Sequence, residues 1–163
     1  MSINFSKNTL TQYLEQLSSR QQVPGGGSAA ALTASLGAGL IAMVANYSIG
    51  RKSNTRALDA KFTKIASRAQ AASKRLLVLT SLDSEAYLKV SKARTLDVKS
   101  QKRAAKDARG VPAEVCKISY QLVQMTPVLV EKGNPYLLSD VEVAVELLMA
   151  AFYSGKVMVR INS

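Results

Sequence analysis

Apolar residues recur along most of this chain at spacings of three and four, which is the periodicity of an amphipathic α-helix. No long stretch alternates apolar and polar residues between turn signals, as a half-buried strand would. The first helical face lies near the start of the chain and consists of Leu10, Tyr13, Leu14 and Leu17. Thr9 and Gln12 have the spacing of a capping box at its N-terminus. The pattern predicts an all-α protein.

A stretch of 30 residues from Gln21 to Gly50 carries no charge. Its first part contains Pro24 and three glycines, where no regular element should continue. We expect Ser28 to cap a helix that runs to about Ile49, with Gly50 as its C-cap. Small residues that allow another helix to approach closely occupy every fourth position, at Ala30, Ala34, Ala38 and Ala42.

This uncharged stretch is also long enough to span a bilayer, which needs about 20 apolar residues. However, its apolar content is mostly Ala and Gly, and polar residues such as Gln22 and Asn46 are interspersed. A helix that is apolar on all sides is equally typical of the buried centre of a bundle. We favour this central-helix interpretation and expect no membrane span.

The next segment has the clearest helical pattern. Its apolar residues alternate spacings of four and three, as in a heptad seam: Leu58, Phe62, Ile65, Ala69, Ala72, Leu76 and Leu79. A separate helix is expected to follow, with Asp83, Ala86, Tyr87 and Val90. A short, very basic stretch comes after it, from Lys99 to Arg109, and the sequence Gly110-Val111-Pro112 predicts the next break.

Two further helices complete the pattern. One contains Leu122, is expected to kink near Pro127, and ends where Gly133 and Pro135 follow. Ser139 and Glu142 predict a capping box at the start of the last helix. No repeat, linker or low-complexity run interrupts the chain. We therefore predict that residues 1–163 form a single-domain helical bundle around a long central helix rich in small residues.

Composition narrows the possible chemistry. The chain has no histidine and a single cysteine, Cys116, which excludes an internal disulfide, a Cys/His metal site and any catalytic triad that uses histidine. Proton transfer must therefore use Asp, Glu, Lys, Tyr or backbone groups. Residues 1–8 are polar and do not have the cationic start and apolar core of a secretory signal. We expect a cytoplasmic protein.

The net charge of +11 is concentrated in one segment. Residues 51–117 contain 17 Lys/Arg and 6 Asp/Glu, whereas the two flanks together contain 5 of each. Such a segment suits a polyanionic partner, which can be nucleic acid, an anionic membrane surface or a multiply charged small molecule; a merely solvated face is the simpler alternative. Tyr87 is the only aromatic residue between Phe62 and Tyr120, so nucleic acid is the second choice.

The most specific local feature is the run of Gly25, Gly26 and Gly27 ahead of Ser28. Exposed backbone N–H groups and the positive end of a helix dipole can cradle a phosphate, a carboxylate or a polar heterocycle. The loop lacks the residues of a Walker loop and does not follow a strand as a dinucleotide fingerprint does. A plain flexible connection is the alternative, but each glycine costs about 0.5–1 kcal/mol relative to alanine, which favours a function.

Other candidate residues have equally simple alternatives. Asp140 can be a carboxylate that accepts or relays a proton near a cleft, or can serve with Ser139 only to cap a helix. Asp83 and Tyr87 lie one helical turn apart and can be a partly exposed pair. Arg160, near the C-terminus with Asn162, can be a solvated end group.

Several short motifs follow one another in a characteristic order: Pro24–Leu32, Met43–Asn46, Asp83–Tyr87, Val111-Pro112, Lys132–Pro135, Ser139–Val141 and Val159–Asn162. In this respect the chain resembles the cyclodeaminase domain of formiminotransferase-cyclodeaminase and its stand-alone relatives, the methenyltetrahydrofolate cyclohydrolases. The resemblance spans nearly the whole chain. It implies an all-α bundle that pairs into homodimers and acts on one-carbon derivatives of tetrahydrofolate, without a metal or redox cofactor.

The resemblance implies one of two reactions. One is hydration of 5,10-methenyltetrahydrofolate to the 10-formyl derivative; the other is loss of ammonia from 5-formiminotetrahydrofolate. We prefer the cyclohydrolase reaction because no transferase half is fused to this domain. Folates carry a glutamate tail, commonly polyglutamylated, and the basic segment would suit that anion. The alternative is a non-catalytic member of the fold that binds nucleic acid or polyglutamate through residues 51–117.

Motif positions carry the expected site residues. The resemblance implies that Gly25, Gly26, Gly27 and Ser28 contact the folate, and that Asn46, Asn134, Arg160 and Asn162 also bind the substrate. Asp140 would orient or deprotonate the attacking water, or move protons at the formimino nitrogen, and Asp83 is a second candidate acid or base. The basic segment 92–109 departs from the family because it is shorter and lacks the Pro and Ile-Gln of relatives. The resemblance alone therefore leaves open whether the site is complete.

Overall fold

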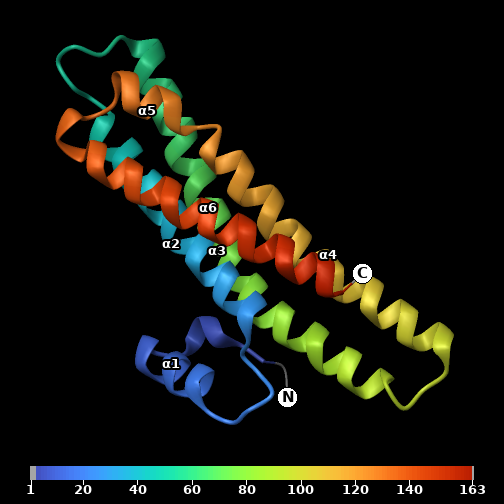
Figure 1. The fold of residues 1–163 in the computed structure, drawn as a ribbon. Helices are drawn as coiled ribbons and strands as arrows, with labels where there is room; N and C mark the ends of the chain where they lie inside the picture. The colour runs from blue at the N-terminus through green and yellow to red at the C-terminus, as the bar shows by residue number, and fades with distance from the viewer. Residues whose placement is uncertain (1–2, 163) are drawn as a thin grey trace.

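The computed structural model describes residues 3–162, and every regular element within that range is helical. The α-helices are α1 (Leu10–Ser18), α2 (Gly26–Ser48), α3 (Arg56–Ala93), α4 (Val98–Val123), α5 (Thr126–Lys132) and α6 (Leu138–Ile161). Two short 3-10 helices, Phe5–Lys7 and Pro135–Leu137, precede α1 and α6. The four long helices α2, α3, α4 and α6 lie side by side and alternate in direction, while α1 stands beside the start of α2 (Figure 1). The all-α prediction is confirmed.

Helix α2 lies at the centre of the packing, as the small-residue pattern predicted. Its four alanines at every fourth position are at most 8% exposed. On one side Ser35 donates a hydrogen bond to the Ser73 carbonyl of α3 at 3.0 Å. On another side Gly37 faces Leu148 of α6 so closely that an added Cβ would lie 2.8 Å from the Leu148 Cγ. Within residues 3–162, α2 alone is long and apolar enough to cross a membrane, and most of it is buried inside the bundle.

Helix α3 is longer than the sequence predicted. The heptad seam is confirmed, because Phe62, Leu76 and Leu79 are fully buried. A separate helix around Asp83 was a wrong prediction, since α3 continues without interruption for 38 residues. No glycine or proline lies within this range, and the Thr80 hydroxyl donates to the Leu77 carbonyl at 2.6 Å inside the helix. The polar residues around Asp83 therefore do not end α3, because the segment contains no glycine or proline that would interrupt a helix.

The predicted break at Gly110-Val111-Pro112 is also wrong, because α4 runs straight through it. A proline removes one backbone N–H donor from a helix interior, and this usually costs about 3 kcal/mol. Here Pro112 is buried where α4 meets Gly155 of α6, and an added Cβ on Gly155 would lie 3.2 Å from the Pro112 carbonyl oxygen. Tight packing between α4 and α6 thus holds the helix through the proline. The chain breaks instead at Gln124, ahead of Pro127 in the first turn of α5.

Helix ends agree with the sequence in part. The capping box of Thr9 and Gln12 is present, and Gly50, at φ 73°, follows the C-cap Ile49 of α2. Ser28 does not cap α2, because the helix begins at Gly26 and Ser28 is buried in its first turn. Glycine adopts helical as well as loop backbone conformations, and here Gly26 and Gly27 form the first residues of α2.

The last helix begins differently from the prediction. The capping box of Ser139 and Glu142 is absent, since α6 starts at Leu138 without a side-chain cap. The chain enters α6 directly from the 3-10 turn at Pro135–Leu137, which is capped by the Asn134 side chain. Gly133 ends α5 as predicted.

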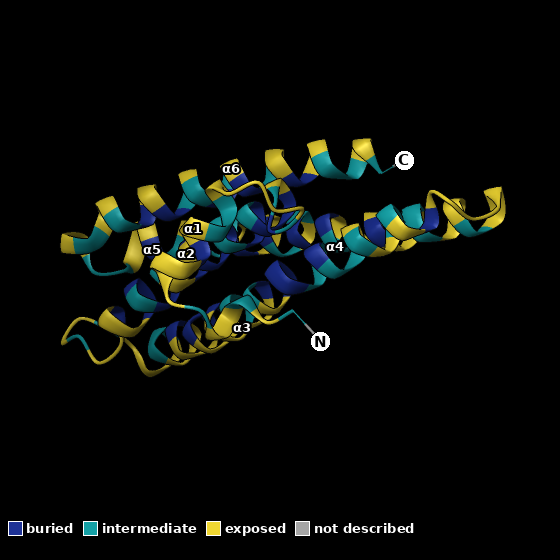
Figure 2. Ribbon diagram, turned by 90° about the horizontal axis from the view of Figure 1, so that it is seen from below, coloured by how far each residue is buried: buried dark blue, intermediate teal, exposed yellow. Residues whose placement is uncertain are grey.

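Helices α3 and α4 continue past the ends of α2 and α6 as a projecting hairpin (Figures 1 and 2). Asp83 packs against Gly27 in the first turn of α2, so the last turns of α3 extend beyond the start of α2. Figure 2 shows that buried residues concentrate where the four helices overlap and become sparse along the hairpin. The hairpin therefore extends beyond the end of the bundle at the start of α2.

Two helical glycines give a matched test of the packing at α2. Gly37→Ala should lower the free energy of unfolding by about 1–3 kcal/mol, because its methyl group would lie 2.8 Å from Leu148 Cγ and 3.1 Å from the Ala144 carbonyl oxygen. Gly110→Ala in α4 should raise it by about 0.5–1 kcal/mol, since no neighbouring atom lies within 4 Å of the added methyl. Urea denaturation measures both. Equal effects of the two substitutions would contradict the close approach of α6 to α2.

Candidate functional site

Asp83 of α3 lies directly against the glycine-rich start of α2. A Cβ on Gly27 would overlap the Asp83 carboxyl group, so only glycine leaves room for it. The Ser28 backbone N–H donates a hydrogen bond to this carboxyl group. The first turn of a helix exposes N–H groups and the positive end of its dipole, and both favour a carboxylate there. The structure thus brings together Asp83 and the glycine run, which the sequence proposed separately.

Tyr13 of α1 also contacts the start of α2, at Ser28. Its hydroxyl lies 3.0 Å from the Ser28 hydroxyl, and its ring packs edge-on against Phe5 with 5.5 Å between ring centroids. The Phe5 backbone N–H in turn donates to the Ser81 hydroxyl of α3 at 2.9 Å. Tyr13 is the one buried residue of α1, at 4% exposed. Sequence reasoning placed it on an apolar face but did not identify it as a neighbour of the glycine run.

Burial sets the protonation behaviour of this cluster. It raises the pKa of Asp83, and the hydrogen bond from the Ser28 backbone opposes the shift. Burial also raises the pKa of Tyr13, where the Ser28 hydrogen bond opposes and the nearby Asp83 charge adds to the shift. A partly exposed carboxyl group with a raised pKa, beside a phenol, has the character of a general acid or base.

The last turn of α6 lies at the same end of the bundle. An added Cβ on Gly26 would lie 3.7 Å from the Met158 sulfur. This contact places the segment with Arg160 and Asn162, which are exposed and partly exposed, near the start of α2. Tyr87, one helical turn beyond Asp83 on the same face of α3, is 42% exposed. We call this group the α2 N-terminal site: Gly25–Ser28, Asp83, Tyr87, Arg160 and Asn162.

The remaining predicted residues lie at the opposite end of the bundle. The Asn134 backbone N–H donates to the Ser48 hydroxyl at 2.9 Å, and its side chain donates to the Tyr47 carbonyl at 3.5 Å. Asn46 is exposed on the last turn of α2, and Asp140 is partly exposed on the first turn of α6. The 20 residues that separate Asp140 from Arg160 along α6 correspond to about 30 Å. A single chain therefore does not bring Asp140 to the α2 N-terminal site.

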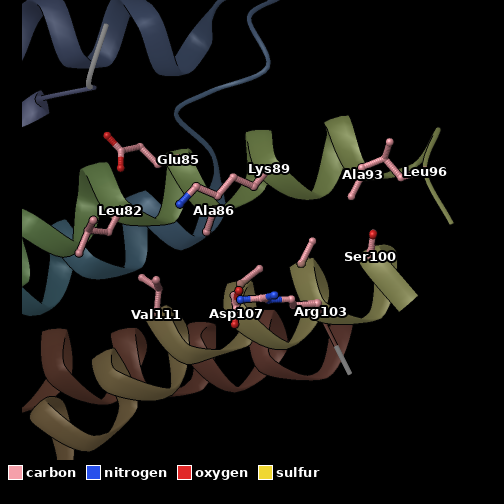
Figure 3. Close-up of a pocket in the computed structure, with 12 residues that line it drawn as sticks. Leu82, Glu85, Ala86, Lys89, Ala93, Leu96, Ser100, Arg103, Asp107 and Val111 are labelled. Atoms are coloured by element: carbon pink, nitrogen blue, oxygen red, sulfur yellow. The ribbon is translucent and has the colours of Figure 1, made fainter. Parts of the chain in front are cut away.

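A groove of about 380 Å³ runs between the hairpin halves of α3 and α4. Its floor is apolar, with Leu82, Ala86, Ala93 and Val111, and Figure 3 shows Lys89 of α3 and Arg103 of α4 along it. Glu85 and Asp107 supply two acidic groups at the same groove. The groove begins one residue from Asp83 along α3, so it adjoins the α2 N-terminal site. It lies within the basic segment that the sequence assigned to a polyanion.

No group of three or more His, Cys, Asp or Glu residues within residues 3–162 is arranged to hold a metal ion. The acid and base groups of the α2 N-terminal site that suit proton transfer are Asp83 and the phenol of Tyr87, and the phenol of Tyr13 lies beside them at Ser28. Chemistry carried by the chain itself at this end thus depends on one carboxyl group, phenol hydroxyls and backbone N–H donors. These groups suit proton transfer and the stabilisation of a developing negative charge.

Comparison with known proteins places the chain in a family. Residues 9–163 match the family described as Formiminotransferase-cyclodeaminase. The methenyltetrahydrofolate cyclohydrolase of Methylorubrum extorquens is 30% identical over 165 residues, which cover 95% of this chain and 79% of that protein. The formimidoyltransferase-cyclodeaminase of Sus scrofa is 32% identical over 163 residues, but the match covers only 30% of its length.

The same fold occurs in a solved structure. The crystal structure of formiminotetrahydrofolate cyclodeaminase from Thermotoga maritima matches with a TM-score of 0.93 at 29% identity. The match covers 96% of this chain and 79% of that chain. The long bundle helices and their order are therefore shared with that protein.

The raised pKa of Asp83 has a testable consequence for stability. A folded state that holds this proton more tightly gains stability below the ordinary pKa of 3.8, and loses it as the pH rises through the raised value. Asp83→Asn removes this dependence, so the variant should gain stability relative to wild type as the pH rises. Free energies of unfolding between about pH 3 and pH 7 measure the difference.

Asp107→Asn provides the control, because Asp107 is an exposed carboxyl group on α4. The difference between this variant and wild type should not follow the Asp83 pattern. If Asp83→Asn and Asp107→Asn changed the stability profile in the same way, Asp83 would not be the buried group described here.

Proposed function

Because the chain belongs to the formiminotransferase-cyclodeaminase family, we propose that it is an enzyme of folate one-carbon metabolism with a tetrahydrofolate derivative as substrate. The observation that carries this proposal is the Asp83 carboxyl group held against Gly27 and Ser28 at the start of α2. The preferred reaction is hydration of 5,10-methenyltetrahydrofolate to 10-formyltetrahydrofolate. The Methylorubrum extorquens cyclohydrolase, of which the match covers 79%, supports this choice.

Asp83 acts as the base in the hydration. It accepts a proton from the water that attacks the methenyl carbon, and returns this proton to N5 as the bond from that carbon to N5 breaks. The proton of the new hydroxyl group is released to solvent as the formyl group forms on N10. Backbone N–H groups of the first turn of α2 stabilise the oxygen as negative charge develops on it. In the alternative reaction, deamination of 5-formiminotetrahydrofolate, N10 attacks the formimino carbon. The N10 proton and the proton of Asp83 pass to the formimino nitrogen, which leaves as ammonia as the methenyl bridge forms. Burial raises the pKa of Asp83 and so favours its protonated form more than in an exposed carboxyl group.

The groove beside the site suits the folate tail. Lys89 and Arg103 line it on opposite helices, together with the acidic Glu85 and Asp107, and the two cationic side chains attract the carboxylates of a glutamate or polyglutamate chain. The apolar floor between them accepts the methylene groups of the tail and the aminobenzoyl ring. In this proposal the basic hairpin is a substrate-binding element. The comparisons give the nucleic-acid alternative no support.

Asp83→Asn should lower the rate of 5,10-methenyltetrahydrofolate hydration by about 10²–10⁴-fold, because the amide cannot accept the proton from water. Loss of the methenyl absorbance, corrected for the spontaneous rate, measures the reaction. A control variant, Glu146→Gln, removes an exposed carboxylate of α6 outside the site and the groove, and should keep the wild-type rate. Wild-type protein that shows no turnover with either the methenyl or the formimino substrate would overturn the proposed function.

Gly27→Ala tests the same contact without removal of the carboxyl group. Its methyl group would displace Asp83, and a shift of about 1 Å in a catalytic group can cost about 100-fold in rate. Gly110→Ala adds the same methyl group where no atom lies within 4 Å, and should leave the rate unchanged. A fully active Gly27→Ala variant would argue against Asp83 as the base.

Lys89→Ala/Arg103→Ala should raise KM for a polyglutamylated substrate by roughly 3- to 10-fold, the effect of two partly solvated charge pairs. KM for the monoglutamyl substrate should change much less, and kcat for both should remain near the wild-type value. Steady-state kinetics at low and high salt measure the difference.

Lys61→Ala/Lys64→Ala gives the control, since these exposed residues lie on α3 about 40 Å from Lys89 by the helical rise. An equal rise in KM for the two double variants would mean that only the overall positive charge matters. In that case the groove would not be the tail-binding element.

A further inference from the structure

The turn that joins α3 and α4 lies at the outer end of the projecting hairpin (Figures 1 and 2). Asp83 packs against Gly27 at the start of α2, and α3 then continues to Ala93. At a rise of about 1.5 Å per residue, the turn stands about 15 Å beyond that contact. We call residues 92–103 the hairpin tip. The hairpin tip is thus held clear of the four-helix core.

Two aliphatic side chains face solvent at the hairpin tip. Leu96 and Val98 are 56% and 65% exposed, and only Asp97 separates them in the sequence. Leu96 lies at the outer end of the groove between α3 and α4, but more than half of its surface remains exposed (Figure 3). Turns between helices are ordinarily made of polar residues, glycine and proline. An exposed aliphatic pair at the most remote turn therefore suggests contact with an apolar partner.

The backbone of this turn is hydrogen-bonded within the turn itself. The Gln101 side-chain amide donates to the Leu96 carbonyl at 2.9 Å and to the Arg94 carbonyl at 3.4 Å. The Asp97 carboxylate accepts from the Ser100 N–H at 3.0 Å and from the Ser100 hydroxyl at 2.6 Å. Polar groups that are already paired oppose transfer out of water less than unpaired groups do. The turn can therefore leave water without loss of its own hydrogen bonds.

Cationic side chains surround the aliphatic pair. Between Lys89 and Arg109 the chain has eight Lys/Arg and two acidic residues, Asp97 and Asp107. Five of these cations lie on the hairpin tip, and all five are exposed: Lys92, Arg94, Lys99, Lys102 and Arg103. Within residues 3–162 none of the five is in an ion pair. The hairpin tip therefore carries a net positive charge that attracts an anionic surface.

An anionic lipid surface fits this combination better than a nucleic acid does. Proteins bind single-stranded nucleic acid largely by stacking aromatic side chains on the bases, and the hairpin tip contains no aromatic residue. Clusters of about four to eight Lys/Arg bind anionic headgroups, and exposed aliphatic side chains next to them enter the membrane interface. The hairpin tip has both features at the same end of the molecule.

We propose that the hairpin tip docks on an anionic lipid bilayer, with Leu96 and Val98 inserted at the level of the headgroups and the surrounding Lys and Arg side chains bound to lipid phosphates and carboxylates. Interfacial segments are buried about 5–10 Å deep, which is less than the projection of the hairpin. The α2 N-terminal site then remains above the headgroups. Because most of α2 is buried inside the bundle, the chain lies on the membrane and does not span it.

Co-sedimentation with vesicles tests the docking. At about 0.1 M salt the full chain should bind vesicles of phosphatidylcholine with about 30% phosphatidylserine, and should not bind vesicles of phosphatidylcholine alone. Lys92→Gln/Lys99→Gln/Lys102→Gln should weaken the binding roughly 100-fold, since each cation near the surface contributes about fivefold in affinity. A wild-type chain that does not bind the anionic vesicles would overturn the proposal.

A second triple variant on α3 gives the matched control. Lys61→Gln/Lys64→Gln/Lys74→Gln removes the same charge from exposed positions outside the hairpin tip. It should change the affinity by less than about threefold, because these positions lie further from the membrane than a Debye length of about 10 Å. Equal losses in the two triple variants would mean that only net charge matters, and docking at the hairpin tip would be wrong.

Fluorescence tests the insertion of the aliphatic pair. The chain contains no tryptophan, so Leu96→Trp reports on the hairpin tip alone. Its emission should shift to shorter wavelength on anionic vesicles and be quenched by lipids brominated near the headgroup end of the acyl chains. Val78→Trp, at a position of α3 that is 46% exposed, should show neither effect. A bound Leu96→Trp chain without shift or quenching, or quenching of both variants, would overturn insertion at the hairpin tip.

A serine pair separates lipid from nucleic acid as the partner. Leu96→Ser/Val98→Ser keeps every cation and should weaken binding to anionic vesicles at least about tenfold, because less apolar surface leaves water. An anisotropy titration with a labelled single strand of about 20 nucleotides should not distinguish this variant from wild type, since only charge acts on the strand. Vesicle binding unchanged by the serine pair, or tight binding of the strand without binding of vesicles, would overturn the proposal. None of these measurements uses a folate, so they stand even if the proposed function fails.

Discussion

The close approach of α3 and α6 to α2 is the constraint on which the rest of this structure depends. Helices with alanine and glycine at the contact can approach until backbone and side chain touch, as Gly37 and Leu148 do. The same approach at the start of α2 places the Asp83 carboxyl group where Gly27 has no side chain. A larger residue at either glycine would separate the helices or displace the carboxyl group. Fold and candidate site therefore rest on one property of α2, its small residues.

Two opposing effects act on Asp83 at this contact. Burial disfavours its charged form, whereas the Ser28 N–H and the positive end of the α2 dipole favour it. Burial is the larger effect, so the pKa is raised. A carboxyl group that is partly desolvated but still hydrogen-bonded by a helix terminus can gain and lose a proton without disruption of the core. This balance distinguishes Asp83 from the exposed carboxylates on the surface of α4 and α6.

The sequence predicted which segments are helical more accurately than it predicted where each helix begins and ends. It identified candidate site residues, but not which of them lie close together in the structure. The heptad seam and the small-residue helix follow from periodicity, which depends on burial and so survives in any helical bundle. The predicted helix break at Pro112 was wrong, because the energetic cost of a proline can be read from the local sequence but the packing that offsets it cannot. That packing joins Pro112 to Gly155, which is more than 40 positions away. The sequence likewise did not identify Tyr13 as a neighbour of the glycine run, because its hydrogen bond to Ser28 depends on how α1 packs against α2.

The composition of α2 follows from its burial inside the bundle. A helix at the surface of a bundle needs one polar side, and a helix that is apolar all round must be covered on every side. Here α3 covers one side of α2 and α6 covers a second, but the stripe through Leu36 and Tyr47 remains open. The length and hydropathy that make α2 resemble a membrane span reflect its burial against α3 and α6, since most of the apolar part of α2 lies inside the bundle.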